Sequence, residues 1–352
     1  MNMALTNNYS GTGLAACLCV NQTENKTECP SIDNFRNQVY STMYSIITLL
    51  GLLGNGFALL VLLRTYQKKS PFQVYMMNLA VSDLLCVSML PFRIHYYANK
   101  GQWYLGDFIC RISSYTFYVN LYCSILFMAA MSVSRFLAIV FPVQNIRLVT
   151  ECRARLACIF IWVFVCAMSS PFLMSGETQD PFTNKTKCYE PPRNGTSTKL
   201  VVLNYLSLVV GFLIPFLIIL VCSAGIIRSL CLRRTHTHRG SKGSRAIRMI
   251  VIVLVTFLVC FTPYHVQRSV HLSFLSNGSC ERLIFMQKSV VVTLSLAASN
   301  CCFDPLLYFF SGEGFRRRMS TMRTSGRRSI QLKQGKAGEP LAGDLNIRSA
   351  AE

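Results

Sequence analysis

The sequence predicts an all-α membrane protein, a seven-transmembrane helix bundle followed by a short amphipathic eighth helix. Three observations predict this class: seven long apolar runs, a charged content of only 14% where soluble domains have about 25%, and basic residues gathered in alternate loops. A helix crosses the hydrocarbon core with about 20 mostly apolar residues. We expect the spans near residues 40–63, 74–97, 110–140, 156–172, 201–227, 247–271 and 287–310.

These spans divide the chain into four regions. We expect residues 1–38 to form a glycosylated extracellular head and residues 39–311 the transmembrane domain. Residues 312–323 read as an amphipathic helix on the inner leaflet, with Phe315 and Met319 four residues apart, and residues 324–352 as a disordered cytoplasmic tail. The first residues lack the basic and apolar regions of a cleavable signal peptide, so the first span is expected to start insertion.

The distribution of charge predicts the orientation in a plasma membrane. Most of the 35 Lys and Arg residues follow spans 1, 3, 5 and 7, which places the tail in the cytoplasm and the head outside. The net charge of +20 is interpreted as topology and attraction to anionic lipids, not as nucleic-acid binding. All Asn-X-Ser/Thr glycosylation acceptors lie on the side expected outside. They are Asn8, Asn21, Asn25, Asn184, Asn194 and Asn277.

Several of the 16 cysteines lie on the outer side, where disulfides persist. A bond between Cys110, at the start of span 3, and Cys188, in the long loop after span 4, would pin that loop over the bundle. A bond between Cys29 and Cys280 would tie the head to the last outer loop. The sequence alone leaves the connectivity open.

Polar residues at membrane depth are costly and therefore indicate function. Asp83 lies in span 2 and Asp304 near the inner end of span 7. Neighbouring spans add amide and hydroxyl groups at similar depth, so the set is predicted to hold a small hard cation such as structural Na⁺; the alternative is a water-filled hydrogen-bond network. No other cofactor is expected. The added groups are Asn120, Ser124 and Asn300, with Asn55 nearby.

One short motif in each span resembles the rhodopsin-like G-protein-coupled receptors. Together the motifs cover residues 40–315, and they stand in the family's order. They are Gly54-Asn55, Leu79-Ala80-X-X-Asp83, Cys110, Arg135, Trp162, Pro215, Phe257-X-X-Cys260-Phe261-X-Pro263 and Asp304-Pro305-Leu306-Leu307-Tyr308.

The resemblance assigns coupling and activation to residues on the inner half of the bundle. Arg135 is expected to reach a heterotrimeric G protein, and prolines give hinges because each removes a backbone hydrogen bond. The expected set is Arg135, Phe261, Pro263, Asp304, Pro305 and Tyr308. Three positions depart from the family: Ser134 replaces an acid, Ser223 a tyrosine and Phe261 a tryptophan. The acidic partner that usually holds the arginine is therefore missing.

The outer half of the bundle predicts a pocket for an anionic ligand with a long apolar body. Tyr264 and Arg268 share one face of span 6, and Tyr118 and Tyr122 share one face of span 3. Arg93 in span 2 and Arg268 are expected at the rim, since a guanidinium suits carboxylate or phosphate. The alternative is an aromatic belt at the membrane interface.

The match is closer to one group of the family. Residues 35–42, 115–124, 263–268 and above all 286–312 resemble the cysteinyl leukotriene receptors, and among these the type 1 group. The resemblance implies a carboxylate-bearing lipid-peptide ligand, contacted by Arg93, Tyr118, Tyr122, Tyr264 and Arg268. It also implies coupling mainly to the Gq/11 class with a rise in cytosolic calcium.

Two alternative functions differ in how well the residues support them. A nucleotide (purinergic-type) receptor of the same branch is the nearest alternative, because His265-X-X-Arg268 also suits phosphates, and another anionic-lipid receptor of that branch stays open beside it. An enzyme or ion carrier is not expected, since the spans show neither a nucleophile with its base nor an inverted repeat. Serine and threonine residues beside arginines in the tail could accept phosphate, with receptor kinases and arrestin as further partners.

Overall fold

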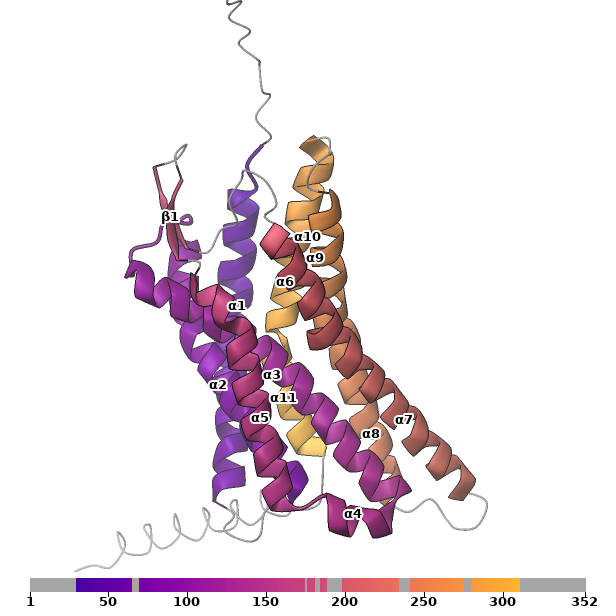
Figure 1. The fold of residues 1–352 in the computed structure, drawn as a ribbon. Helices are drawn as coiled ribbons and strands as arrows, with labels where there is room; N and C mark the ends of the chain where they lie inside the picture. The colour runs from indigo at the N-terminus through magenta and orange to yellow at the C-terminus, as the bar shows by residue number, and fades with distance from the viewer. Residues whose placement is uncertain are drawn as a thin grey trace, which may run out of the picture.

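The computed structural model describes residues 30–64, 70–174, 176–180, 184–188, 198–233, 241–274 and 280–310. Within these ranges, seven helical segments are long and apolar enough to cross a membrane, and they stand side by side in one bundle (Figure 1). This confirms the predicted fold class. The expected eighth helix at 312–323 and most of the head and tail lie outside the described residues.

The bundle has two distinct ends. Strands β1 and β2 form an antiparallel hairpin at one end, with Glu177 opposite Cys188, and helix α4 lies at the other (Figure 1); we call these the hairpin end and the α4 end. The elements in chain order are α1 (Asp33–Leu63), α2 (Pro71–Ala98), α3 (Gly106–Val140), α4 (Pro142–Leu148), α5 (Glu151–Ser169), η1 (Ser170–Met174), β1 (Glu177–Gln179), β2 (Thr186–Cys188), α6 (Thr198–Leu208), η2 (Val209–Leu213), α7 (Ile214–Arg233), α8 (Ser241–Thr256), η3 (Phe257–Phe261), α9 (Thr262–Phe274), α10 (Cys280–Ala298) and α11 (Asn300–Phe310).

Most helices begin earlier than the apolar runs. Helix α1 starts at Asp33 rather than near residue 40, and α10 at Cys280 rather than near 287. The apolar pattern marks only the part of a helix that lies in hydrocarbon, whereas the start depends on capping. The side chain of Ser70 accepts from Gln73 N in a capping box that begins α2, and the side chain of Thr150 accepts from Arg153 N at the start of α5.

Irregular turns accompany the prolines of the bundle. Segments η2 and η3 are both π-helical, and each ends two residues before a proline, Pro215 and Pro263. A proline cannot donate its backbone N–H and crowds the preceding turn, so a wider turn relieves the clash. The last span is interrupted at Ser299 between α10 and α11, six residues before Pro305. The predicted hinges therefore coincide with real departures from α-helical geometry.

The core is densest around α3, which lies among the other helices (Figure 1) and buries residues along most of its length. Helices α1 and α11 approach closely at Gly54, where an added Cβ would lie 2.7 Å from Pro305 Cγ. Only glycine allows this separation, because any side chain would push the two backbones apart. Gly56 lies two residues further along α1, on another face of the helix, and an added Cβ there would meet no atom within 4 Å.

Candidate functional site

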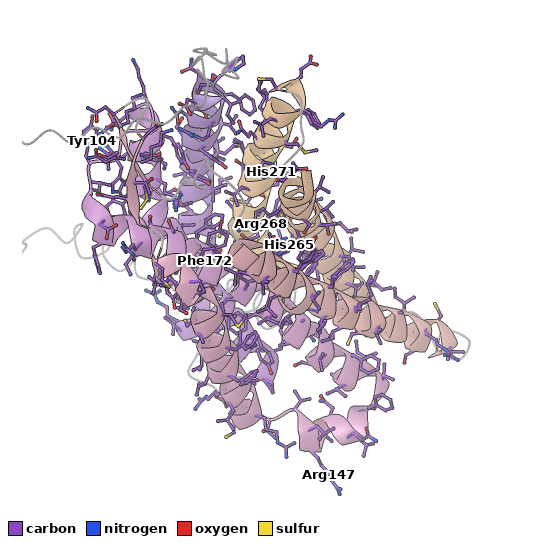
Figure 2. The ribbon with its side chains drawn as sticks, turned by 45° about the horizontal axis from the view of Figure 1, so that its top comes forward. Tyr104, Arg147, Phe172, His265, Arg268 and His271 are labelled. Carbon is purple, nitrogen blue, oxygen red and sulfur yellow. A yellow bond between two sulfur atoms is a disulfide. The ribbon has the colours of Figure 1, made fainter. Side chains whose placement is uncertain are left out.

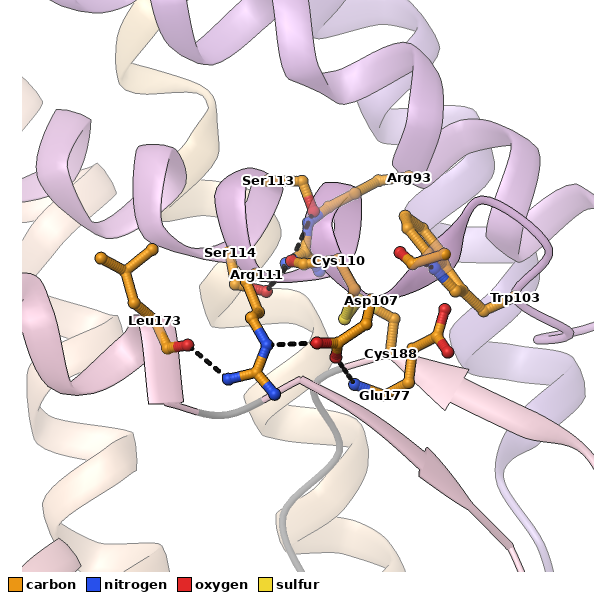
Figure 3. The surroundings of a disulfide bond; sticks show 11 residues. Arg93, Trp103, Asp107, Cys110, Arg111, Ser113, Ser114, Leu173, Glu177 and Cys188 are labelled. Carbon is orange, nitrogen blue, oxygen red and sulfur yellow. Dashed lines mark hydrogen bonds and ion pairs between the residues drawn. A yellow bond between two sulfur atoms is a disulfide. The ribbon is translucent and has the colours of Figure 1, made fainter.

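A loop is fastened to α3 at the hairpin end of the bundle (Figure 3). Cys110 of α3 forms a disulfide with Cys188 of β2, which confirms that predicted pair. Arg111 Nη1 donates to the Leu173 carbonyl at 2.6 Å, and the Glu177 N–H donates to Asp107 Oδ1 at 2.9 Å.

The second predicted disulfide is only partly described. Cys280 is disulfide-bonded, but Cys29 lies outside the described residues. The Cys29–Cys280 pair therefore stays a prediction.

Arg93 lies deeper than predicted. Arg93 is only 9% exposed, so it is buried among the helices and does not lie at the rim of the bundle. One Nη donates to Ser114 Oγ on α3 at 2.6 Å, Tyr44 and Tyr97 lie near its charge, and its Nε has no hydrogen-bond partner. The described residues include no acidic side chain in an ion pair with Arg93. A buried cation without a counter-ion is costly, and its occurrence indicates an anion-binding site.

Arg268 lies across from α3 on helix α9. Its Nη1 donates to the hydroxyl of Tyr264 at 3.0 Å and to that of Tyr118 at 3.4 Å. Its Nε donates to Asn204 Oδ1 on α6 at 3.1 Å. Tyr118 is also within electrostatic range of Arg93, so this tyrosine is near both cations. The structure thus brings together four of the five predicted ligand residues.

The fifth, Tyr122, lies one turn further toward the α4 end. It is half-buried, contacts Ser207 of α6 and packs edge-on against the ring of His265, with 6.0 Å between centroids. His265 is stacked on Phe212 of η2 at 4.5 Å, and its Nε2 has no hydrogen-bond partner. Tyr122 and His265 therefore form an aromatic layer beneath Arg268.

Phe172 of η1 was missed by the sequence reasoning. Its ring is stacked on Tyr118 with centroids 3.8 Å apart and an interplanar angle of 9°, and Figure 2 places it in the same part of the bundle as Arg268 and His265. Arg147 projects at the opposite end. Phe172 stands at the end of an apolar run without any periodic signal, so only the folded chain reveals its role. The complete site offers two guanidinium groups among aromatic faces, which suits an anionic head on an apolar body.

A second polar cluster lies in the middle of the bundle. Asp83 and Asp304 are fully buried and lie close enough for their charges to interact. Asn120 Nδ2 donates to Asp83 Oδ1 at 2.9 Å and lies 3.5 Å from Ser124 Oγ. The second oxygen of Asp83, both oxygens of Asp304 and the side-chain nitrogen of Asn300 have no hydrogen-bond partner.

These residues fit a small monovalent cation. Two adjacent buried carboxyls repel unless a proton or a cation lies between them, and three of their four oxygens are unsatisfied. Among the residues that the structure describes, no group of three or more His, Cys, Asp or Glu could hold a metal ion. The cluster thus offers oxygen donors and negative charge to a small hard cation such as Na⁺, the ion expected from the sequence.

Hydrogen bonds connect this cluster to its neighbours. Asn55 Nδ2 donates to the Cys301 carbonyl at 2.8 Å, and the Tyr308 hydroxyl donates to Asn55 Oδ1 at 3.4 Å. Phe261 is fully buried in η3 with its ring edge-on to Phe257. The hydrogen bonds of Asn55 therefore join α1 to α11.

At the α4 end, Arg135 lies over the ring of Phe72, with its guanidinium carbon 4.0 Å from the ring centroid. Phe72 belongs to the first turn of α2, and sequence reasoning did not single it out. Ser134 and Ser223 are both buried, and Ser223, Ser132 and Arg135 line a small cavity with apolar residues of α8.

Asn184 is the one predicted glycosylation acceptor within the described residues. It is exposed in the turn of the hairpin, with φ of 50°. Such a position leaves its amide accessible. Asn8, Asn21, Asn25, Asn194 and Asn277 lie outside the described residues.

Comparison with known proteins decides the family. The model of the seven-transmembrane receptors of the rhodopsin family matches residues 54–308. The chain belongs to this family. The receptor is 56% identical to the human "Cysteinyl leukotriene receptor 1" over 92% of its own chain and 97% of that protein. It is 41% identical to the mouse "Cysteinyl leukotriene receptor 2", over 82% of its chain and 92% of the relative.

A third relative bears on the choice of ligand. The receptor is 38% identical to the human "Uracil nucleotide/cysteinyl leukotriene receptor", over 84% of its chain and 79% of that protein. Family membership makes this a multi-pass signalling receptor of the plasma membrane that acts through G proteins, and not an enzyme.

Proposed function

We propose that the receptor recognises cysteinyl leukotrienes and couples mainly to Gq/11, which raises cytosolic calcium. The observation that carries the proposal is Arg93, a buried guanidinium without an acidic partner among the described residues. Together with Arg268 it offers two cationic groups to the carboxylates of a lipid-peptide. The names of the curated relatives support the same ligand class.

The proposed orientation places the hairpin end outside the cell and the α4 end in the cytoplasm. The Cys110–Cys188 disulfide supports it, because disulfides persist in the oxidising exterior. The exposed acceptor Asn184 lies at the same end. Arg147 and Arg153, near α4, follow the positive-inside rule.

In the proposed mechanism, the ligand bridges Arg93 and Arg268 and packs on Tyr118 and Tyr264. Ligand binding shifts the population of two bundle states, because the ligand contacts helices from opposite sides of the pocket. Helix α9 and η3 then pivot at Pro263. The polar cluster around Asp83 rearranges, and the arginine at the α4 end becomes available to the G protein.

Bound Na⁺ would belong to the ligand-free state in this proposal. Asp83, Asn120, Ser124, Asn300 and Asp304 would hold it, and the cation would supply the positive charge that the two carboxyls require. Receptor kinases and arrestin are proposed as partners of the phosphorylated tail, and lipids as the medium around the apolar helix faces.

The direct test is a calcium response in transfected cells challenged with a cysteinyl leukotriene panel and, in parallel, a nucleotide panel. We expect a leukotriene response that is weakened by Arg93→Ala and by Arg268→Ala at equal surface expression. A response blocked by a Gq/11 inhibitor would support the coupling. Calcium unchanged under every leukotriene would refute the ligand class.

Recognition of nucleotides is the second candidate. One relative carries uracil nucleotide in its name, and the guanidinium of Arg268 suits phosphate as well as carboxylate. A response to nucleotides alone in the same experiment would establish this alternative and leave the fold and the arginines in place.

A further inference from the structure

Asn204 joins helices α6 and α9 beside Arg268. It lies in α6 and is only 4% exposed. Its Oδ1 accepts from Arg268 Nε at 3.1 Å, and its Nδ2 donates to Ser269 Oγ at 3.3 Å. A single side-chain amide thus binds two consecutive residues of α9.

The hydrogen bonds fix which way the amide points. The Ser269 hydroxyl donates to the His265 carbonyl at 2.9 Å on its own helix, so its single proton is used there and its oxygen accepts. The amide nitrogen of Asn204 must then face Ser269, and the amide oxygen must face Arg268. The hydrogen-bond network therefore fixes which end of the Asn204 amide is nitrogen and which is oxygen.

This arrangement sets the direction of the Arg268 guanidinium. The five N–H donors of arginine lie in one plane. With Nε on Asn204 and Nη1 on Tyr264 and Tyr118, the plane is held at two edges. Asn204 and Tyr264 approach from helices α6 and α9, and Tyr118 from α3. The guanidinium is therefore held near the rings of Tyr118 and Tyr264, with its carbon 5.9 Å from each ring centroid.

The partner at Nε is neutral, and this decides what the contact can do. An amide oxygen orients a guanidinium without adding a negative charge, whereas a carboxylate at the same place would form an ion pair and weaken its attraction for an anion. Asparagine and aspartate have nearly the same shape, so the distinction is one of charge.

We propose that Asn204 is a positioning residue for ligand recognition, which holds Arg268 in its binding direction without placing a negative charge at its Nε. The inference rests on the proposed function, because it takes the ligand to be anionic. The competing explanation is that Asn204 only ties α6 to α9.

The test is saturation binding of a radiolabelled cysteinyl leukotriene to membranes that carry the full-length receptor. Asn204→Ala should weaken binding about tenfold, the effect of one charge-assisted hydrogen bond. Asn204→Asp should weaken it at least as much as Arg268→Ala does. Asn99→Ala, an exposed amide bonded to His95 of its own helix, is the matched control and should bind as the unmodified receptor does.

A double variant separates positioning from simple support. If Asn204 acts through Arg268, then Asn204→Ala combined with Arg268→Ala should bind within about twofold of Arg268→Ala alone. If the two losses multiply, or if Asn204→Asp binds like the unmodified receptor, the inference is overturned while the proposed function stands. If the unmodified receptor does not bind the leukotriene, the proposed function fails and the inference fails with it. The number of sites in each membrane preparation reports folding.

Discussion

Replacing Arg93 by methionine should affect ligand binding and stability differently. Methionine has a similar length but no charge. The ligand would lose a charge-assisted hydrogen bond of about 1.5–3 kcal/mol, so Kd should rise about 10- to 150-fold. In the ligand-free receptor, losing the hydrogen bond to Ser114 lowers the stability. Removing a buried charge with an unsatisfied Nε raises it, so the free energy of unfolding should change little. Ser114 keeps its hydrogen bond to the Cys110 carbonyl.

The two effects are measured on one preparation. We expect the melting temperature of the purified ligand-free protein to change by no more than about 3 °C, which corresponds to about 1 kcal/mol. Radioligand binding then gives the change in Kd. Arg155→Met is the control, since Arg155 is exposed and forms a surface ion pair with Glu151 that contributes little. A variant with unchanged Kd and a melting temperature lowered by ten degrees would show that Arg93 serves the fold, and the reasoning would be refuted.

Three further predictions concern the rest of the bundle. Phe72→Leu removes the ring beneath Arg135, an interaction of about 0.5–2 kcal/mol, so basal inositol phosphate formation should rise several-fold. Phe72→Trp keeps an aromatic ring and should keep basal formation low. Equal basal activity in the two variants would argue that the ring of Phe72 does not restrain Arg135. Gly54→Val should destabilise the receptor by about 1–3 kcal/mol through the clash with the proline of α11, and Gly56→Val, in open space, should be nearly neutral in the same thermal assay. Replacing K⁺ by Na⁺ should raise the melting temperature of the unmodified receptor but not of Asp83→Asn; an equal effect in both would place the ion elsewhere.

Much of the fold could be predicted because the bilayer imposes its length on every span. Apolar runs located the seven helices, whereas the orientation from the charge pattern stays a prediction. Helix starts were missed by up to seven residues, as at Asp33, because polar residues continue a helix beyond the hydrocarbon. Helix α4 and the hairpin were also missed, since both are short and neither has a long periodic pattern.

The candidate site was predicted where residues share a helix face. Tyr264 and Arg268 are four residues apart on one helix, so periodicity placed them together. Phe172 and Phe72 were missed because their partners lie on other helices, and no spacing within one segment reveals such a pair. Asn204 carried a usable signal, since it is a polar residue within an apolar run, but its meaning depends on the rotation of α6 against α9.

Each of the two π-helical turns contains about one residue more than an α-helical turn. Segments η2 and η3 hold more residues in a turn than an α-helix does, while the helices on either side stay regular. One residue corresponds to about 100° of rotation in an α-helix. If the wide turn moves along the helix by one turn, the residues it passes rotate by that angle while the ends of the helix stay in place. His265 is stacked on Phe212, which lies in η2. Such a movement would give both rings new neighbours while every helix keeps its length.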